Sequence, residues 1–265
     1  MIRLAAALAL PLVGLAAPAA LASQCQQLAG APEARIWRAA LAPGEVRIRF
    51  LGHAALRIET DAGQVAVTDY YGASGGGKTP DVVTMNHAHS SHWTRSPDAA
   101  IPHVLQGWGE GLEPARHWVQ LGEMLVRNVP TDIRAGAGWE ADGNSIFVFE
   151  YEGLCIGHLG HLHHLPTEED YAQIGRLDVV MAPVDGGYTM SIPDMITVLK
   201  RVKARVVIPM HIFSSFALEK FLAGMADEFV VNGEPASEIV LSATTLPDRP
   251  TIRVLDPEGG HTIYE

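Results

Sequence analysis

The chain has 265 residues, of which 48% are hydrophobic, and a formal net charge of −11 at pH 7. This negative balance argues against nucleic acid or an anionic membrane as partner, because both are themselves negatively charged. A small molecule is therefore the expected substrate or ligand. The length suits one large domain or two small ones, and no linker-like or charged block divides it.

The first residues are typical of an export signal. Arg3 supplies a positive start, residues 4–21 are mostly Ala and Leu, and residues 20–22 place small side chains where a signal peptidase reads. The alternative is a membrane anchor, but prolines and a glycine interrupt the apolar run. We expect residues 1–22 to be removed, leaving residues 23–265 as a single secreted, periplasmic domain without a stable membrane anchor.

Two cysteines remain after removal of this leader, Cys25 and Cys155. Disulfides form and persist in oxidising compartments such as the periplasm. The sequence therefore predicts a disulfide bond between Cys25 and Cys155. The alternative is that Cys155 is a metal thiolate, which would leave Cys25 unpaired.

Strand-type segments make up the first half of the domain. Residues 45–51 alternate apolar side chains with arginine, as a half-buried strand does. Tight turns are indicated at residues 61–63 and 152–153. The expected strands are residues 45–51, 53–60, 64–69, 80–86, 123–130, 145–152 and 154–160.

The second half alternates helices with buried strands. Helices are expected at residues 167–175, 191–203 and 217–228, and strands at 177–184, 205–210, 238–242 and 251–255. Residues 177–184 form a continuous apolar run, which is typical of a strand buried on both faces. Early strands followed by β-α-β units predict an α/β (α+β) fold, with two sheets packed face to face and helices outside.

Histidines follow the ends of several expected strands. His87, His89 and His92 come directly after the strand at residues 80–86, and side chains two apart in an extended segment point the same way. His161 follows another strand, after a glycine that allows an unusual turn, and His211 follows a buried one. Imidazole is a common metal ligand, so these strand ends predict one metal site.

Six motifs occur in the order found in metal-dependent hydrolases. They are residues 50–54, 67–69, 87–92, 159–161, 183–184 with 188–189, and 208–211. In this ordered set the chain resembles the metallo-β-lactamase superfamily, in its branch of stand-alone bacterial proteins, from about residue 45 to residue 211. The resemblance implies an αββα sandwich and, in active members, a zinc-bound hydroxide that acts as the nucleophile.

The resemblance also implies roles for particular residues. The residues that correspond to metal ligands of the family are His87, His89, His92 and His211. His161 also occupies a ligand position. Asp69 would support the histidine loop from behind, and His53 would line the cleft.

Three positions depart from the family pattern. Ser91 and His161 stand where family members carry aspartates, and residues 131–132 lack the family's histidine. Two +2 ions about 4 Å apart repel with four times the unit-charge energy, which is itself roughly 4 kcal/mol at an effective dielectric of 20. Without the aspartates that offset this repulsion, we expect one divalent ion. Four imidazoles suit Zn²⁺ best, and also Cu²⁺ or Fe²⁺.

Asp185 follows the buried strand at residues 177–184, where the family usually has glycine. Its carboxylate can face the cleft and act as the catalytic general base. The alternative is a turn aspartate that caps Gly186 and Gly187.

Two functions remain open from the sequence. The first is an exported hydrolase of an ester, amide, lactone or phosphoester. The second is a periplasmic protein that uses the same fold to bind a metal or sense a ligand without turnover.

Overall fold

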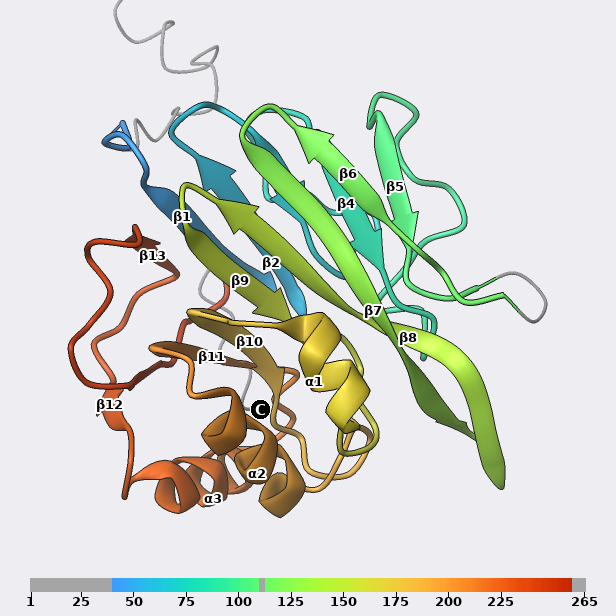
Figure 1. Cartoon of the computed structure of the whole chain (residues 1–265), viewed down its shortest axis with the longest axis vertical. Helices are drawn as coiled ribbons and strands as arrows, with labels where there is room; N and C mark the ends of the chain where they lie inside the picture. The colour runs from blue at the N-terminus through green and yellow to red at the C-terminus, as the bar shows by residue number, and fades with distance from the viewer. Residues whose placement is uncertain (1–39, 110–112, 259–265) are drawn as a thin grey trace, which may run out of the picture. The chain divides into compact units, whose positions relative to one another are not determined.

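The computed structural model describes residues 40–109 and 113–258 (Figure 1). The expected leader at residues 1–22, the domain start at residue 23 and Cys25 lie outside the described residues. No helix in the described ranges has both the length and the apolar character needed to cross a bilayer.

Two β-sheets pack against each other. The strands of the first sheet are β1 (Val46–Gly52), β2 (Ala55–Thr60), β3 (Val65–Val67), β4 (Val82–Met85), β5 (His103–Gln106) and β13 (Glu238–Leu241). Those of the second are β6 (Trp118–Leu121), β7 (Met124–Ala135), β8 (Gly138–Tyr151), β9 (Leu154–His158), β10 (Val179–Pro183), β11 (Val206–Met210), β12 (Val230–Asn232) and β14 (Thr251–Arg253). Their orders are β13-β1-β2-β3-β4-β5 and β12-β14-β11-β10-β9-β8-β7-β6.

The apolar run of β10 is buried on both faces, as expected. Val179 and Met181 pack in the core between the two sheets, with Phe50 of β1. Val180 and Ala182 point the other way, into the core beneath the helices. The alternation follows from the two-residue period of a strand, so a continuous apolar sequence serves two cores.

Three helices cover the outer face of the eight-stranded sheet (Figure 1). They are α1 (Glu168–Ile174), α2 (Ile192–Val202) and α3 (Ser215–Met225). Thr167 and Asp170 form a capping box that starts α1, and the side chains of Ser191 and Ser214 cap α2 and α3. The predicted sandwich of two sheets with helices outside is confirmed.

Cys155 lies on β9 as a free, half-buried thiol. Its Sγ accepts a hydrogen bond from Arg176 Nη2 at 3.2 Å. Because Cys25 is outside the described residues, the disulfide stays a prediction.

Candidate metal centre

Four histidines meet where strand ends of the two sheets come together. His53 joins β1 to β2, His89 and His92 follow β4, and His211 follows β11. One ring nitrogen from each lies within 4.8 Å of the others. We call these four residues the histidine cluster. Three of the four, His89, His92 and His211, are ligands predicted from the sequence. The structure adds His53 to this set of possible ligands.

His161 lies beside this cluster, after the end of β9. Its Nε2 is 3.0 Å from Nε2 of His89, and its ring centroid is 4.8 Å from that of His211. The side chain is buried, and its backbone N–H donates to Asn144 Oδ1 at 2.7 Å. β8, which carries Asn144, therefore helps to hold His161 against the cluster.

Gly160 makes this turn possible. Its φ is +58°, and a Cβ there would lie 2.4 Å from Asn144 Oδ1 and 2.5 Å from Asn86 Nδ2. Asn86 in turn accepts a hydrogen bond from the backbone N–H of Ser145 at 2.8 Å, which ties the loop after β4 to β8. Only glycine fits between these side chains, so the turn that aims His161 depends on it.

Oxygen atoms support the rings of His92 and His89 from behind. Nδ1 of His92 donates to Asp69, which also accepts from Asn86 Nδ2 at 2.9 Å. Nδ1 of His89 lies 2.6 Å from Ser91 Oγ. Burial alone would raise the pKa of Asp69, but the nearby rings of His92 and His158 and two hydrogen bonds lower it. The ionised carboxylate holds the His92 ring with its Nε2 toward the cluster.

Asp185 closes a turn and also supports the cluster. Its Oδ1 accepts backbone N–H bonds from Gly187, Tyr188 and Thr189 at 2.8, 2.5 and 3.0 Å. Its Oδ2 accepts from His211 Nδ1 at 2.9 Å. Burial alone would raise the pKa of Asp185, but the hydrogen bonds, with that from His211 first, lower it well below its usual range. Asp185 therefore caps the turn and also supports His211 from behind, and its role as catalytic general base stays a prediction.

Three of these residues have left-handed backbone conformations. The φ angles are 54° at His53, 42° at Asp69 and 53° at His211. The backbone N–H of His211 also donates to the carbonyl of His53 at 2.6 Å, which joins the loop after β11 to the loop after β1. Such conformations cost about 1–3 kcal/mol each for a residue other than glycine and are typical of functional sites.

The environment favours the neutral form of two of the cluster imidazoles, His53 and His89. Burial first, and then the neighbouring rings, lowers the pKa of His53 to about 3 and that of His89 to about 4. A neutral imidazole offers a lone pair, which is what a metal ion needs. The donor set, all nitrogen with oxygen acceptors behind it, therefore fits Zn²⁺, Cu²⁺ or Fe²⁺.

His87 lies apart from the cluster. Its Nδ1 is 3.0 Å from Glu140 Oε1 on β8, and its ring lies 5.2 Å from that of Trp108. The chain bends after β4 instead of remaining extended, so His87 and His89 point in different directions. The structure therefore places the predicted ligand His87 away from the other predicted ligands, which are His89, His92, His161 and His211.

His163 is a neighbour of the site that sequence reasoning missed. Its Nε2 lies 2.5 Å from Nδ1 of His161, and its Nδ1 accepts the backbone N–H of Arg134 at 2.6 Å. His164 instead accepts from the backbone N–H of Asp132 at 3.1 Å. The two-residue spacing of His161 and His163 was the available signal, the same signal that had suggested pairing His87 with His89.

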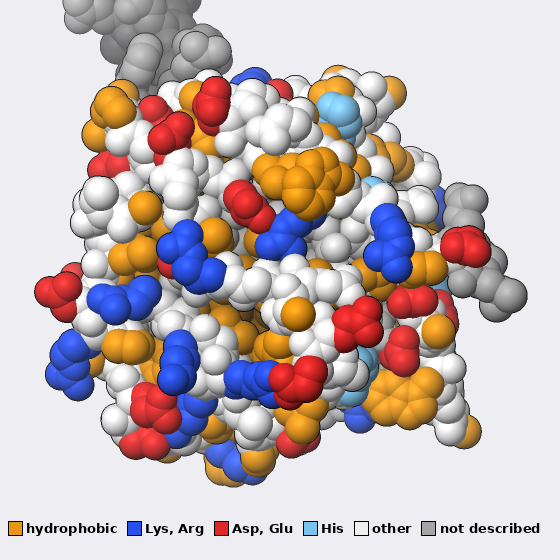
Figure 2. Space-filling view, in the orientation of Figure 1, with side chains coloured by type: hydrophobic (Ala, Val, Ile, Leu, Met, Phe, Trp, Pro, Cys, Tyr) orange, Lys and Arg blue, Asp and Glu red, His pale blue; other side chains and the backbone are white. Residues whose placement is uncertain are grey.

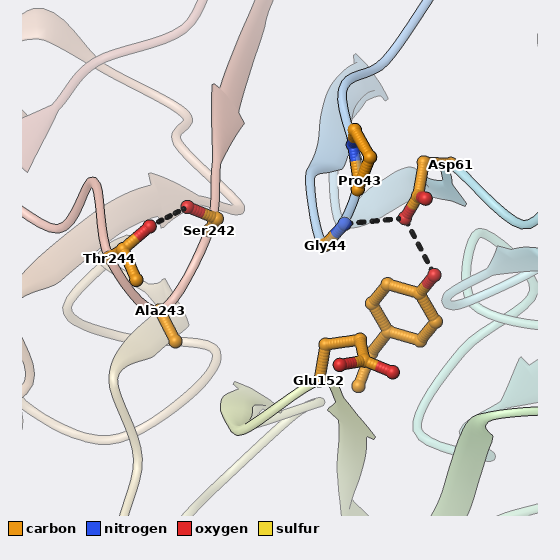
Figure 3. Close-up of a pocket in the computed structure, with 8 residues that line it drawn as sticks. Pro43, Gly44, Asp61, Glu152, Ser242, Ala243 and Thr244 are labelled. Carbon is orange, nitrogen blue, oxygen red and sulfur yellow. Dashed lines mark hydrogen bonds between the residues drawn. The ribbon is translucent and has the colours of Figure 1, made fainter.

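A pocket of about 410 Å³ is drawn in Figure 3. It lies at the ends of β2 and β9 that are opposite to the histidine cluster. Asp61 follows the end of β2 and Glu152 precedes β9, whereas the histidines lie at the other ends of these strands. In the pocket, the Tyr151 hydroxyl donates to Asp61 Oδ1 at 2.6 Å, and Gly44 N–H donates to the same oxygen at 3.0 Å. These polar groups satisfy each other, and the pocket is separate from the metal centre.

The fold and site define a metallo-β-lactamase-type protein, and comparison with known sequences agrees. Residues 47–211 match the model of the β-lactamase superfamily domain, so the chain belongs to the metallo-β-lactamase superfamily. It is similar to a "UPF0173 metal-dependent hydrolase" of Cupriavidus metallidurans, with 27% identity over 71% of this chain and 79% of that protein. A similar protein of the same description in Methanoregula boonei is 26% identical over 63% of this chain and 82% of its own length.

A solved structure from Thermotoga maritima has the same fold. That protein is proposed to be a zinc-dependent hydrolase of the metallo-β-lactamase superfamily. The match has a TM-score of 0.58 and 26% identity, and it covers 80% of this chain and all of the other.

Proposed function

We propose that the protein is an exported metal-dependent hydrolase that holds a single divalent ion, zinc by preference, in the histidine cluster. The observation that carries the proposal is the convergence of four imidazoles whose supporting groups include two buried carboxylates. Superfamily membership and the relatives described as metal-dependent hydrolases support the same class. When bound, the ion would lower the pKa of a water molecule and so supply hydroxide for attack on the substrate.

The chain's own residues would hold and orient this centre. His89, His92 and His211 each present Nε2 to the cluster while Nδ1 is engaged elsewhere. Metal-binding histidines normally donate their second N–H in this way, which sets the tautomer and the ring orientation. His53 supplies the fourth nitrogen, and its Nε2 lies 2.9 Å from Ser91 Oγ.

Two exposed aromatic residues beside the histidine cluster favour a substrate with an apolar group. The ring of Phe213 lies 4.8 Å from that of His211 and 5.2 Å from that of Tyr188. Both aromatic side chains are exposed, at 49% and 68%. Exposed neighbouring aromatics are unfavourable in water and are a common feature of binding sites. We therefore favour an ester or lactone with an acyl or aromatic substituent.

The surface charge supports a small substrate over a polyanion. Acidic and basic side chains are interspersed on the face drawn in Figure 2, with hydrophobic groups between them. A nucleic-acid-binding surface would instead gather lysine and arginine in one patch.

Metal analysis and a hydrolysis screen test the proposal together. We expect one ion per chain by elemental analysis, and turnover of chromogenic esters or lactones that follows metal content. His211→Ala should lose most of both, whereas His103→Ala, on β5, should keep them. One bound ion with no turnover of any ester, lactone, amide or phosphoester would favour the metal-binding or sensing function instead. Absence of bound metal from the parent protein would refute both.

A further inference from the structure

The hydrogen bonds behind the site divide its rings into two kinds. His92 and His211 donate Nδ1–H to the carboxylates of Asp69 and Asp185. Nδ1 of His89 has Ser91 Oγ as its neighbour, which can also accept. Each of these rings then has a lone pair on Nε2, on the side of the cluster, and is ready to bind a metal.

His161 has the opposite arrangement. His163 Nδ1 accepts the backbone N–H of Arg134, and a backbone N–H can only donate. A neutral imidazole carries a single proton, so His163 must carry it on Nε2. That nitrogen lies 2.5 Å from Nδ1 of His161, which must therefore accept. The proton of neutral His161 is then on Nε2, the nitrogen that lies 3.0 Å from His89 Nε2.

The hydrogen bonds fix both rings by geometry. Nδ1 of His163 must keep a lone pair to accept from the Arg134 backbone N–H, and Nδ1 of His161 must keep one to accept from His163. The chain of donors from Arg134 through His163 to His161 therefore runs in one direction, toward the cluster.

We propose that His161 is a hydrogen-bond donor in the centre and not a metal ligand, and that His163 is the positioning residue that holds it in this tautomer. The inference rests on the proposed function for its consequence. When His89 uses its lone pair for an ion, Nε2–H of His161 becomes available to an oxygen atom of a ligand beside that ion. The carbonyl oxygen of an ester or lactone is such an acceptor, and its acceptor strength rises as negative charge develops there during attack.

A direct test reads the tautomers in the parent protein. Long-range ¹H–¹⁵N spectra distinguish Nδ1–H from Nε2–H in each histidine, and the metal-free protein is sufficient for the measurement. We expect Nε2–H at both His161 and His163, before and after addition of Zn²⁺. A proton on Nδ1 of His161 in either state would overturn the inference. Because the metal-free spectrum needs neither metal nor turnover, failure of the proposed function leaves this result interpretable.

Metal affinity provides the second test. His161→Phe should retain one Zn²⁺ per chain with an affinity within about threefold of the parent, because it removes no ligand. His163→Glu replaces the donor behind His161 with a group that can only accept, so His161 should move its proton to Nδ1. Its Nε2 then becomes a ligand, and the Zn²⁺ dissociation constant should fall on the order of tenfold.

His164→Glu is the matched control for charge. It places the same carboxylate one residue away, where His164 contacts the backbone of Asp132. We expect it to change the Zn²⁺ affinity much less than His163→Glu does. Loss of Zn²⁺ from folded His161→Phe protein to the extent seen in His211→Ala would show that His161 is a ligand. Equal tightening by both glutamate variants would show an effect of charge alone and would also contradict the inference.

Discussion

Asp185 shows how one side chain can serve both a turn and a metal centre. Its Oδ1 collects three backbone N–H groups, while Oδ2 remains for His211. Because a buried carboxylate needs several donors to stay ionised, the turn itself supplies the conditions under which Asp185 can orient the ring.

Asp185→Asn should weaken metal binding without removing a ligand. The amide is a poorer acceptor for His211 Nδ1–H, so we expect the Zn²⁺ dissociation constant to rise about 10–100-fold. Thermal unfolding should also show a loss of roughly 1–3 kcal/mol, because hydrogen bonds to a charged group are lost. Competition with a chromophoric chelator measures the affinity. Asp248→Asn, at an exposed loop position, is the control, and an unchanged affinity in Asp185→Asn would contradict the assigned role.

Phe213→Ala should alter substrate preference more than catalysis. If the Phe213 ring contacts the acyl chain, its removal should raise KM for an octanoyl ester at least about tenfold, because burial of such a side chain contributes about 1.5–3 kcal/mol and each 1.4 kcal/mol is a factor of about ten. KM for the acetyl ester and the metal content should remain within about twofold. Trp118→Ala removes another exposed aromatic, on β6, and should have no effect on either ester. Equal losses for both esters in Phe213→Ala would refute this contact.

At the residue level, the sequence predicted the positions of the histidines better than their directions. Histidine at three strand ends indicated His89, His161 and His211 correctly as neighbours, because the ends of strands in adjoining sheets meet. The direction of His87 depends on the bend after β4, which no periodicity signals. The contact between His163 and His161 depends on a hydrogen bond that His163 accepts from the backbone of Arg134 on β7. Arg134 is distant in sequence, so no local pattern signals this contact.

The strands that the sequence analysis missed share a position in the fold. β5 lies at one edge of the six-stranded sheet, and β6 and β12 are the two edges of the eight-stranded sheet. All three are short, and most of their side chains are half-buried or exposed. The predicted strands within the sheets were confirmed because burial imposes apolar residues on them. An edge strand has less such constraint, so its sequence carries a weak signal.

β2 gives a prediction about pH. Arg57 is fully buried, and its Nε donates to Glu59 Oε1 at 2.6 Å. Burial alone would raise the pKa of Glu59, but the hydrogen bond and charge of Arg57, with the charges of Arg49 and Arg47, lower it. The folded state therefore binds this proton less readily than the unfolded chain. The resulting stability is present above the ordinary carboxyl pKa and is lost as the pH falls through the folded value.

Glu59→Gln should remove that dependence. We expect a loss of roughly 1–3 kcal/mol in the free energy of unfolding at pH 7, and a flatter decline than in the parent between pH 5 and pH 3. Urea unfolding at a series of pH values measures both quantities. Glu219→Gln, at an exposed position of α3, should follow the parent curve. Parallel curves for Glu59→Gln and the parent would contradict the prediction.

For the whole molecule, metal binding should appear as thermal stability. An ion that binds only the folded state adds about 2.7 kcal/mol when its free concentration is 100 times Kd. For a domain of this size the gain corresponds to a rise in Tm of about 5–10 °C. Calorimetry of chelator-treated protein with and without Zn²⁺ measures it. His211→Ala should show little shift, and a shift as large as that of the parent would place the ion elsewhere.

The predicted disulfide also concerns the whole chain, since it would join the N-terminal segment to β9. Cys155 is half-buried and its thiol contacts Arg176, so pairing would exchange this hydrogen bond for a covalent link. We expect protein recovered from a periplasm to begin near residue 23 and to show no alkylation without reductant in intact-mass spectra. Reduction should then expose two thiols. Two alkylated cysteines in exported, unreduced protein would exclude the bond.

The left-handed backbone at His53 and His211 has a consequence for how this protein can evolve. Asparagine tolerates this conformation better than histidine does, so replacement there would relieve strain on the order of 1 kcal/mol at each position. Folding stability and metal binding therefore pull these two positions in opposite directions. A lineage that no longer needed the activity would be expected to lose His53 and His211 early, whereas Asp69 would be retained longer through its hydrogen bond to Asn86. A library selected for thermal stability alone should reproduce that order of loss.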